Sequence, residues 1–213
     1  MKLKLIILTI FLFSYYQNNA QTKAVTETGD EVILFSNGMW KYVDEAKNAN
    51  DTIQIKTNPN KFQKNASSTF LLKSKKTDIG FWINPKKWSF QKAAQGGAAE
   101  YSFTYKEGDM YGTAIIEKVE IPLESLEEIA LKNAQDAAPD SHIVEKEYRN
   151  VNGLTVLMLR IEGTLQGIKF VYLGYYFSNE NGTVQYVVYT SQNLLKTSRK
   201  ILETFLNGIT VVK

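Results

Sequence analysis

The stretch Phe170-Val171-Tyr172-Leu173-Gly174-Tyr175-Tyr176-Phe177 decides the fold of this chain. Both faces of this run are apolar, which is typical of a central strand that is covered on both sides. Two helical segments accompany it, one before it and one after it. We therefore predict an α+β fold, in which an antiparallel β-sheet is flanked by helices as an α/β/α sandwich.

Short turns separate this run from its neighbours. Asn152-Gly153 and Asn181-Gly182 are residue pairs that tolerate the positive φ of a tight hairpin turn. Connections this short join antiparallel strands, so they argue against a Rossmann fold. The strands expected in the main domain are 69–72, 79–83, 99–106, 111–121, 142–149, 154–162, 168–178 and 183–190.

Two helices are expected in the same domain. Ser125 and Glu128 fit a capping box, in which each side chain satisfies a free backbone N–H of the first turn. Apolar residues then recur at helical spacing until Pro139 ends the helix. A second helix is predicted over 192–206, with an apolar stripe and a stop at Asn207-Gly208.

The first twenty residues have the layout of a signal peptide. A basic start with Lys2 and Lys4 precedes an apolar run over 5–16, and a polar stretch ends in the small residue Ala20. The run is short for a membrane span. We predict cleavage between Ala20 and Gln21 and export to the periplasm or the extracellular space, with an uncleaved anchor as the alternative.

Three further segments follow the leader. Turns at Gly29-Asp30 and Asn37-Gly38 predict a small β-meander over 21–45. Residues 46–67 are polar and predict a linker, and 68–213 form the main domain. Asp51-Thr52-Ile53 resembles an acceptor pattern for bacterial O-glycosylation, so Thr52 is either a modification site or part of a plain polar linker.

Composition excludes several classes of function. The chain has 25 Lys and Arg against 22 Asp and Glu, and loss of Lys2 and Lys4 with the leader would leave 23, a formal net charge of +1. Such a balance gives no electrostatic footprint for nucleic acid or for an anionic membrane. The absence of cysteine excludes disulfides, thiol catalysis and cysteine-ligated metals.

No catalytic constellation is evident. His142 is the single histidine, no Gly-x-Ser-x-Gly elbow is present, and a zinc site would need further ligands of the usual kind. Glu127 and Glu128 are adjacent on a helix and point apart, and their place in its first turn complements the helix dipole. We therefore predict no catalytic residue, no metal and no cofactor, and a hydrolase is the least favoured function.

Aromatic residues are the remaining candidates for a binding site. We predict binding roles for Trp82, Trp88, Tyr101, Tyr105 and Tyr111, because aromatic rings with a polar tip are common in protein and glycan recognition. The alternative is that they fill the interface between sheet and helices. Trp88 follows a Pro-Lys-Lys turn and is expected to be the most exposed of them.

The order of these elements resembles a known family. Residues 79–85 followed by Trp88, the helix at Ser125, the turn 151–154 and a last helix ending at Phe205 are similar to the family of the photosystem extrinsic protein PsbP and a Ran-binding nuclear import factor. The resemblance covers about residues 68–212 and leaves the amino-terminal meander outside. It implies a non-enzymatic domain that binds or assembles partner proteins, and it identifies no ligand residue.

These observations together predict an exported, non-catalytic binding module. Its partner would be an unknown protein of the bacterial envelope or the extracellular space, and nucleic acid is not expected. The alternative is a domain that binds a small molecule or a glycan through exposed aromatic residues.

Overall fold

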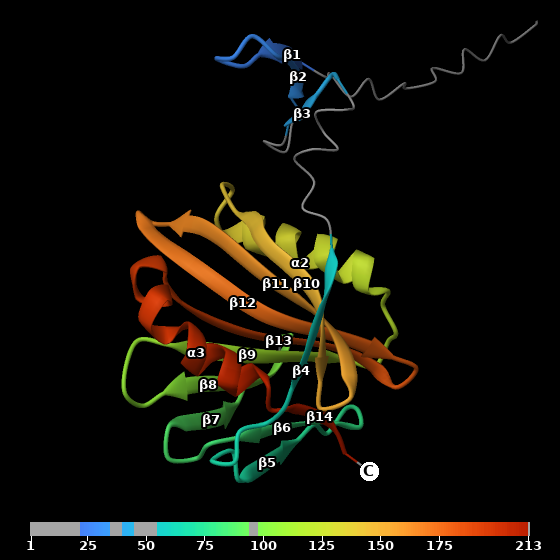
Figure 1. The fold of residues 1–213 in the computed structure, drawn as a ribbon, viewed down its shortest axis with the longest axis vertical. Helices are drawn as coiled ribbons and strands as arrows, with labels where there is room; N and C mark the ends of the chain where they lie inside the picture. The colour runs from blue at the N-terminus through green and yellow to red at the C-terminus, as the bar shows by residue number, and fades with distance from the viewer. Residues whose placement is uncertain (1–21, 35–39, 45–54, 94–97, 213) are drawn as a thin grey trace, which may run out of the picture. The chain divides into compact units, whose positions relative to one another are not determined.

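The computed structural model describes residues 22–34, 40–44, 55–93 and 98–212 (Figure 1). The chain divides into two compact units, 1–52 and 53–213. The predicted leader, its cleavage site at Ala20 and Gln21, and Thr52 lie outside the described residues, so these three predictions stand as predictions. Within the described ranges, no helix is both long and apolar enough to cross a membrane.

The first unit contains three short strands. They are β1 (Thr22–Val25), β2 (Glu31–Leu34) and β3 (Trp40–Tyr42), paired antiparallel in the order β1-β2-β3. Gly29 has a φ of 85° in the first turn, the left-handed conformation that favours glycine. The three strands match the predicted meander, whereas its second turn falls outside the described residues.

The second unit is built on a large mixed sheet. Its eight strands have the order β4-β10-β11-β12-β13-β9-β8-β7. Their bounds are β4 Lys56–Phe62, β7 Trp88–Lys92, β8 Ala99–Tyr105, β9 Tyr111–Glu117, β10 His142–Val151, β11 Leu154–Leu165, β12 Ile168–Asn179 and β13 Gly182–Ser191. A smaller antiparallel sheet has the order β14-β6-β5, with β5 Phe70–Lys73, β6 Ile79–Ile83 and β14 Ile209–Val211.

The apolar run identified in the sequence lies on β12, in the middle of the large sheet. Tyr175 and Phe177 belong to the core on one face of the sheet, and Tyr176 belongs to the core on the other. Each face of this strand is buried, as a strand that is apolar on both sides requires.

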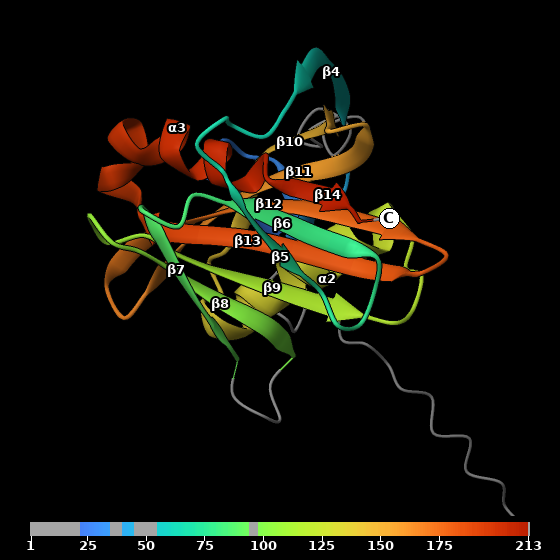
Figure 2. The same cartoon turned by 90° about the horizontal axis from the view of Figure 1, so that it is seen from below.

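Two helices lie on opposite faces of this sheet (Figure 2). α2 (Leu123–Ala137) packs Leu126, Ala130 and Ala134 against strand β11 and its neighbours. α3 (Leu195–Leu206), preceded by a 3-10 turn over Gln192–Leu194, packs Leu202, Phe205 and Leu206 on the other face together with β6. The predicted α+β class is confirmed. The layer on the face opposite α2 consists of α3 together with the small sheet β14-β6-β5.

Strand β4 corrects part of the predicted linker and makes the sheet mixed instead of antiparallel. It lies within the 46–67 segment and pairs parallel with β10, and the Asn58 amide donates to both carboxylate oxygens of Glu147 at 3.1 Å. The strand is polar because it lies at the edge of the sheet, where most of its side chains are exposed.

The start of α2 corrects a second prediction. The helix begins at Leu123, directly after Pro122, which is the N-cap and forms no side-chain cap hydrogen bond. Proline suits a helix start because it lacks the backbone N–H that would have no partner within the helix there, and its φ of −53° is already close to helical. Ser125 therefore lies inside the first turn, and the predicted capping box does not form.

Candidate functional site

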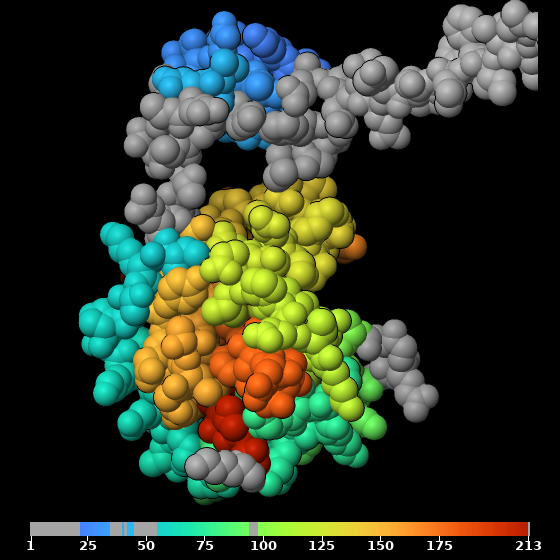
Figure 3. Space-filling model, turned by 90° about the vertical axis from the view of Figure 1, so that its right-hand side faces the viewer, coloured from blue at the N-terminus to red at the C-terminus, as the bar shows by residue number. Residues whose placement is uncertain are grey.

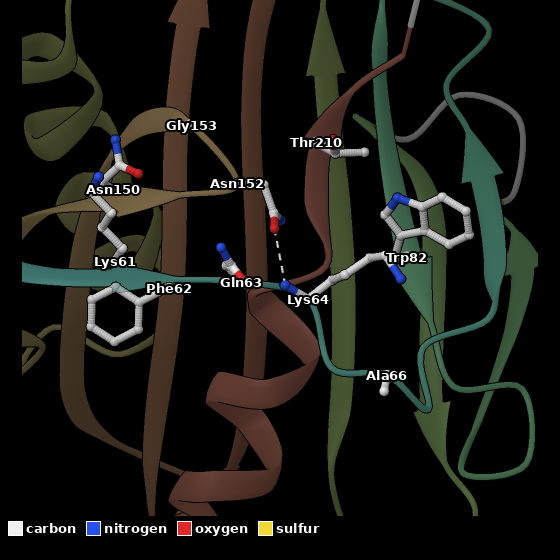
Figure 4. A pocket seen from close by; sticks show the side chains of 10 residues that line it. All are labelled: Lys61, Phe62, Gln63, Lys64, Ala66, Trp82, Asn150, Asn152, Gly153 and Thr210. Atoms are coloured by element: carbon white, nitrogen blue, oxygen red, sulfur yellow. Dashed lines mark hydrogen bonds between the residues drawn. The ribbon is translucent and has the colours of Figure 1, made fainter.

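A groove of about 660 Å³ lies where the end of β4 passes the small sheet (Figure 4). The residues after β4 form one wall, and Trp82 of β6 with Thr210 of β14 forms the other. The turn between β10 and β11 closes one end with Asn152 and Gly153. Both β4 and β14 are the last strands of their sheets, so each has one edge with no strand beside it within the described residues.

Trp82 presents its indole ring to this groove. Its neighbours Phe81 and Ile83 are buried, and because side chains alternate along a strand, Trp82 is placed on the outer face of β6. The backbone N–H of Trp82 donates to the Gly208 carbonyl at 2.8 Å, which fixes the strand against the chain after α3. The Lys64 ammonium lies 4.7 Å from the centre of the indole ring, a cation–π contact.

Asn152 holds the groove together. Its backbone has a φ of 51°, and its side-chain oxygen accepts from the Lys64 N–H at 3.0 Å. Its side-chain nitrogen donates to the carbonyls of Asn207 at 2.8 Å and Ile209 at 2.7 Å. The side chain thus ties three segments of the chain together and is an element of the scaffold, since both of its amide hydrogens are engaged.

The groove is electropositive. Lys61 and Lys64 are both exposed along it, and the amides of Gln63 and Asn150 are the other side-chain polar groups there without a hydrogen bond inside the described chain. None of the residues that line the groove carries a carboxylate. An anionic group would therefore meet no like charge in the groove.

An arginine network lies behind the groove. Arg149 is 4% exposed, stacks on the Phe62 ring at 4.7 Å, and donates to the Tyr175 hydroxyl at 2.9 Å. Its guanidinium also bonds Glu147 at 2.5 Å and Glu203 at 3.3 Å. Burial alone would lower the pKa of Arg149, but these partners raise it above its ordinary value. Such a paired, buried cation fixes β10 against α3.

The other two arginines of the chain extend this network. Arg199 bonds both carboxylate oxygens of Glu145, at 2.7 and 3.0 Å, and Arg160 bonds the same carboxylate at 3.1 Å. Burial favours a raised pKa for Glu145, yet Arg199 and Arg160 hold that pKa below its ordinary value. Sequence reasoning missed this cluster, because its members lie on strands and a helix far apart in the chain.

The chain is similar to known proteins in its fold and not in its sequence. No family model matches the chain, and no curated protein matches it in sequence. Its structure matches the solution structure of cyanobacterial PsbP (CyanoP) from Synechocystis sp. PCC 6803 with a TM-score of 0.51 and 14% sequence identity, over 67% of this chain and 91% of that one. The chain has a PsbP-like fold. At this identity the likeness concerns the fold alone.

Two other structures are similar to the PsbP-like unit at lower scores. One is PA94 from Pseudomonas aeruginosa, a protein of unknown function and putative regulator, with a TM-score of 0.42 and 12% identity over 68% of this chain and 96% of that one. The other is LpqN of Mycobacterium tuberculosis, involved in cell envelope biogenesis, with a TM-score of 0.47 and 13% identity over 63% of this chain and 83% of that one.

The five aromatic residues predicted for binding separate into two groups in the PsbP-like unit. Trp88, Tyr101 and Tyr105 are at most 5% exposed and belong to the core. The expected exposure of Trp88 is wrong: it is the first residue of β7, points inward, and stacks on Phe205 at 4.0 Å. Trp82 and Tyr111 keep ring surface that a partner can reach.

Tyr111 is remote from the groove in the sheet order. It is 39% exposed on β9 and stacks on Tyr189 of β13 at 5.6 Å. The groove thus contains one of the predicted residues, Trp82, together with lysines that the sequence did not single out. The sequence contained a sign of these lysines, because Lys61 and Lys64 lie in a polar segment, 55–68, that has no acidic residue.

The residues considered for catalysis are dispersed. His142 is exposed at the start of β10, with Nδ1 at 3.0 Å from the Asp140 carbonyl oxygen. Glu127 is paired with Lys146 at 2.7 Å instead of facing a second carboxylate. Over the described part of the chain, no three His, Asp or Glu side chains converge in a way that could hold a metal ion.

Proposed function

We propose that this protein is a non-catalytic module that acts in the bacterial envelope and binds a partner protein in the groove beside Trp82. The observation that carries the proposal is an accessible tryptophan beside two exposed lysines, in a groove with no carboxylate. Tryptophan is enriched among the residues that contribute most to protein interfaces. Complementary charge adds specificity and a faster association rate.

The chemistry of the groove favours an extended peptide segment of the partner. Such a segment would carry an aromatic or aliphatic residue for Trp82 next to an Asp or Glu for Lys61 and Lys64. β14 borders the groove through Thr210 and is the last strand of its sheet, so its backbone can accept a further strand.

A neutral glycan is the second candidate, because sugar rings stack on tryptophan. The groove supports it less well. Asn152 has already used its amide hydrogens within the scaffold, and the remaining side-chain polar groups are dominated by the ammonium groups of Lys61 and Lys64. Those charges favour an anionic partner over a neutral one.

Peptide display against the purified full chain tests the site. We expect enrichment of peptides that place an acidic residue next to an aromatic or aliphatic one. Affinity for such a peptide should fall at least about tenfold, or about 1.4 kcal/mol, in Trp82→Ala and in Lys64→Glu. Lys169→Glu is the matched control, an equal charge reversal at an exposed lysine of β12 outside the groove. Equal affinity for Trp82→Ala and the parent protein would refute the site.

Export is tested separately. Amino-terminal sequencing of the protein from cell fractions should give Gln21 as the first residue in the exported fraction. An intact Met1 on a cytosolic product would contradict the envelope location without bearing on the groove.

A further inference from the structure

A second cavity lies on the opposite face of the large sheet, beside α2 (Figure 3 shows α2 in yellow-green). One helix is about 10–12 Å wide, whereas eight strands at about 4.8 Å spacing span about 34 Å. α2 packs over β10, β11 and β12, so β13 and β9 extend beyond it on this face. A pocket of about 290 Å³ lies along this boundary, between α2 and the strands β12, β13 and β9.

Three tyrosines form the walls of this pocket, which we call the tyrosine pocket. Tyr172 and Tyr189 meet edge to face at 5.7 Å, and Tyr176 lies on the same side of β12. The Tyr176 ring lies over Gly174, where an added Cβ would stand 2.8 Å from the ring. A glycine within a central strand is unfavourable for strand stability, and here it marks the close approach that places this ring.

Gln185 supplies the observation that points to a ligand. It is 5% exposed, lines the pocket, and stands opposite Tyr176 on the neighbouring strand. Its side-chain amide makes no hydrogen bond to any described residue. Buried amides are nearly always paired, because burial without a partner is unfavourable. The amide atoms of Gln185 are not fully enclosed, so they are open to the pocket, where water or a ligand that enters it can complete their hydrogen bonds.

The lining also defines the charge of the ligand. Besides the tyrosines, Ile161 and Val187 contribute apolar surface, and none of the lining side chains is a carboxylate, an ammonium or a guanidinium. Burial raises the pKa of Tyr176, and it raises the pKa of Tyr172 together with a smaller effect of Tyr189. The tyrosine hydroxyls are therefore neutral at ordinary pH, and a charged ligand would find no counterion here.

We propose that the tyrosine pocket binds a neutral aromatic compound of one or two rings that carries one hydrogen-bonding group for Gln185. The rings pack against the tyrosines, as aromatic side chains favour. The size fits, since the volume lies at the lower end of small-molecule sites. This site is independent of the groove at Trp82, which lies on other strands.

Isothermal calorimetry with 2-naphthol tests the proposal, with naphthalene-2-carboxylate as the charged analogue of equal ring size. We expect saturable binding of 2-naphthol with a Kd of about 1 mM or tighter and at least about tenfold weaker binding of the carboxylate. Gln185→Leu and Tyr189→Ala should each weaken 2-naphthol binding. Trp82→Ala, at the groove, should leave it unchanged.

Gln185→Leu also has a readout that loss of fold cannot imitate. Because it replaces an amide that makes no hydrogen bond within the described chain by an apolar side chain of similar size, the free protein should keep or raise its melting temperature while it loses the ligand. The proposal is overturned if 2-naphthol does not bind saturably, if both naphthalenes bind equally, or if Gln185→Leu binds as the parent does.

Discussion

The two tryptophans of the PsbP-like unit provide a matched pair of substitutions. Trp88 is 4% exposed, lies on the Phe205 ring at 4.0 Å and has the Tyr105 ring at 5.2 Å. Truncation of a buried tryptophan to alanine removes this packing and leaves a cavity, at a cost of about 3–5 kcal/mol. Trp88→Ala should therefore lower the free energy of unfolding by about that amount.

Trp82→Ala is the comparison, because it truncates the same side chain where it is only partly buried. The substitution removes the cation–π interaction between the Lys64 ammonium and the indole ring, which contributes about 0.5–1 kcal/mol, together with the contacts of the partly buried ring. For a unit of this size, about 1 kcal/mol corresponds to roughly 2–4 °C in melting temperature. We expect a decrease of roughly 6–20 °C for Trp88→Ala and a clearly smaller decrease for Trp82→Ala.

Far-ultraviolet circular dichroism during urea and thermal unfolding of the full chain measures both values. Trp88→Phe keeps an aromatic ring on Phe205 and should be destabilised clearly less than Trp88→Ala. The reasoning fails if Trp88→Ala is destabilised by less than about 1 kcal/mol, the range typical of surface substitutions, or if Trp82→Ala is destabilised more than Trp88→Ala. The first result would mean that Trp88 is not a core residue, and the second that Trp82 contributes more packing than Trp88.

Three further predictions concern the scaffold. Arg149→Met removes the cation that bonds the partly buried Glu147 and one of the two arginines that bond Glu203, so it should destabilise the protein by about 1.5–3 kcal/mol in urea unfolding; a decrease below about 1 kcal/mol would contradict the network. Gly208→Ala would place a Cβ 2.0 Å from the Trp82 carbonyl oxygen and should cost about 1–3 kcal/mol by the same assay, whereas an unchanged midpoint would show that this approach is not close. Burial would raise the pKa of Glu145, but Arg199 and its neighbours hold that pKa lower in the folded protein than in the unfolded chain. The Glu145 carboxylate therefore stabilises the fold at pH values above its unfolded-state pKa, and this stabilisation is lost as the pH falls through its folded-state pKa. The melting temperature of Glu145→Gln should accordingly fall less than that of the parent between neutral and acid pH, and parallel curves would argue against this role.

Much of the fold could be predicted from local patterns. The hairpin turns at Asn152-Gly153 and Asn181-Gly182 and the apolar run on β12 are local features, and their strands agree with the sequence to within a few residues. β4 could not be predicted in this way. Its pairing with β10 depends on residues far along the chain, and an edge strand can remain polar because water reaches most of its side chains.

The candidate sites were less predictable, because they too depend on residues that lie far apart in the chain. Whether an aromatic ring is a ligand contact or a core residue depends on what packs against it, and for Trp88 that is Phe205, from the other end of the domain. The segment after β4 becomes one wall of a groove only when β6 and β14 lie opposite it. In the sequence Gln185 is an ordinary strand residue, and its lack of a partner is visible only in three dimensions.

The pairing of β4 has a consequence for how the polypeptide is made. Asn58 and its partner Glu147 are 89 residues apart, so β4 is synthesised well before β10 exists. In that interval the segment is an unpaired strand beside incomplete sheet elements, the kind of intermediate that aggregates. Lys56, Pro59 and Lys61 are residues that oppose strand-to-strand association between molecules. The composition that makes β4 a good sheet edge should therefore also disfavour pairing between molecules while β10 is still missing.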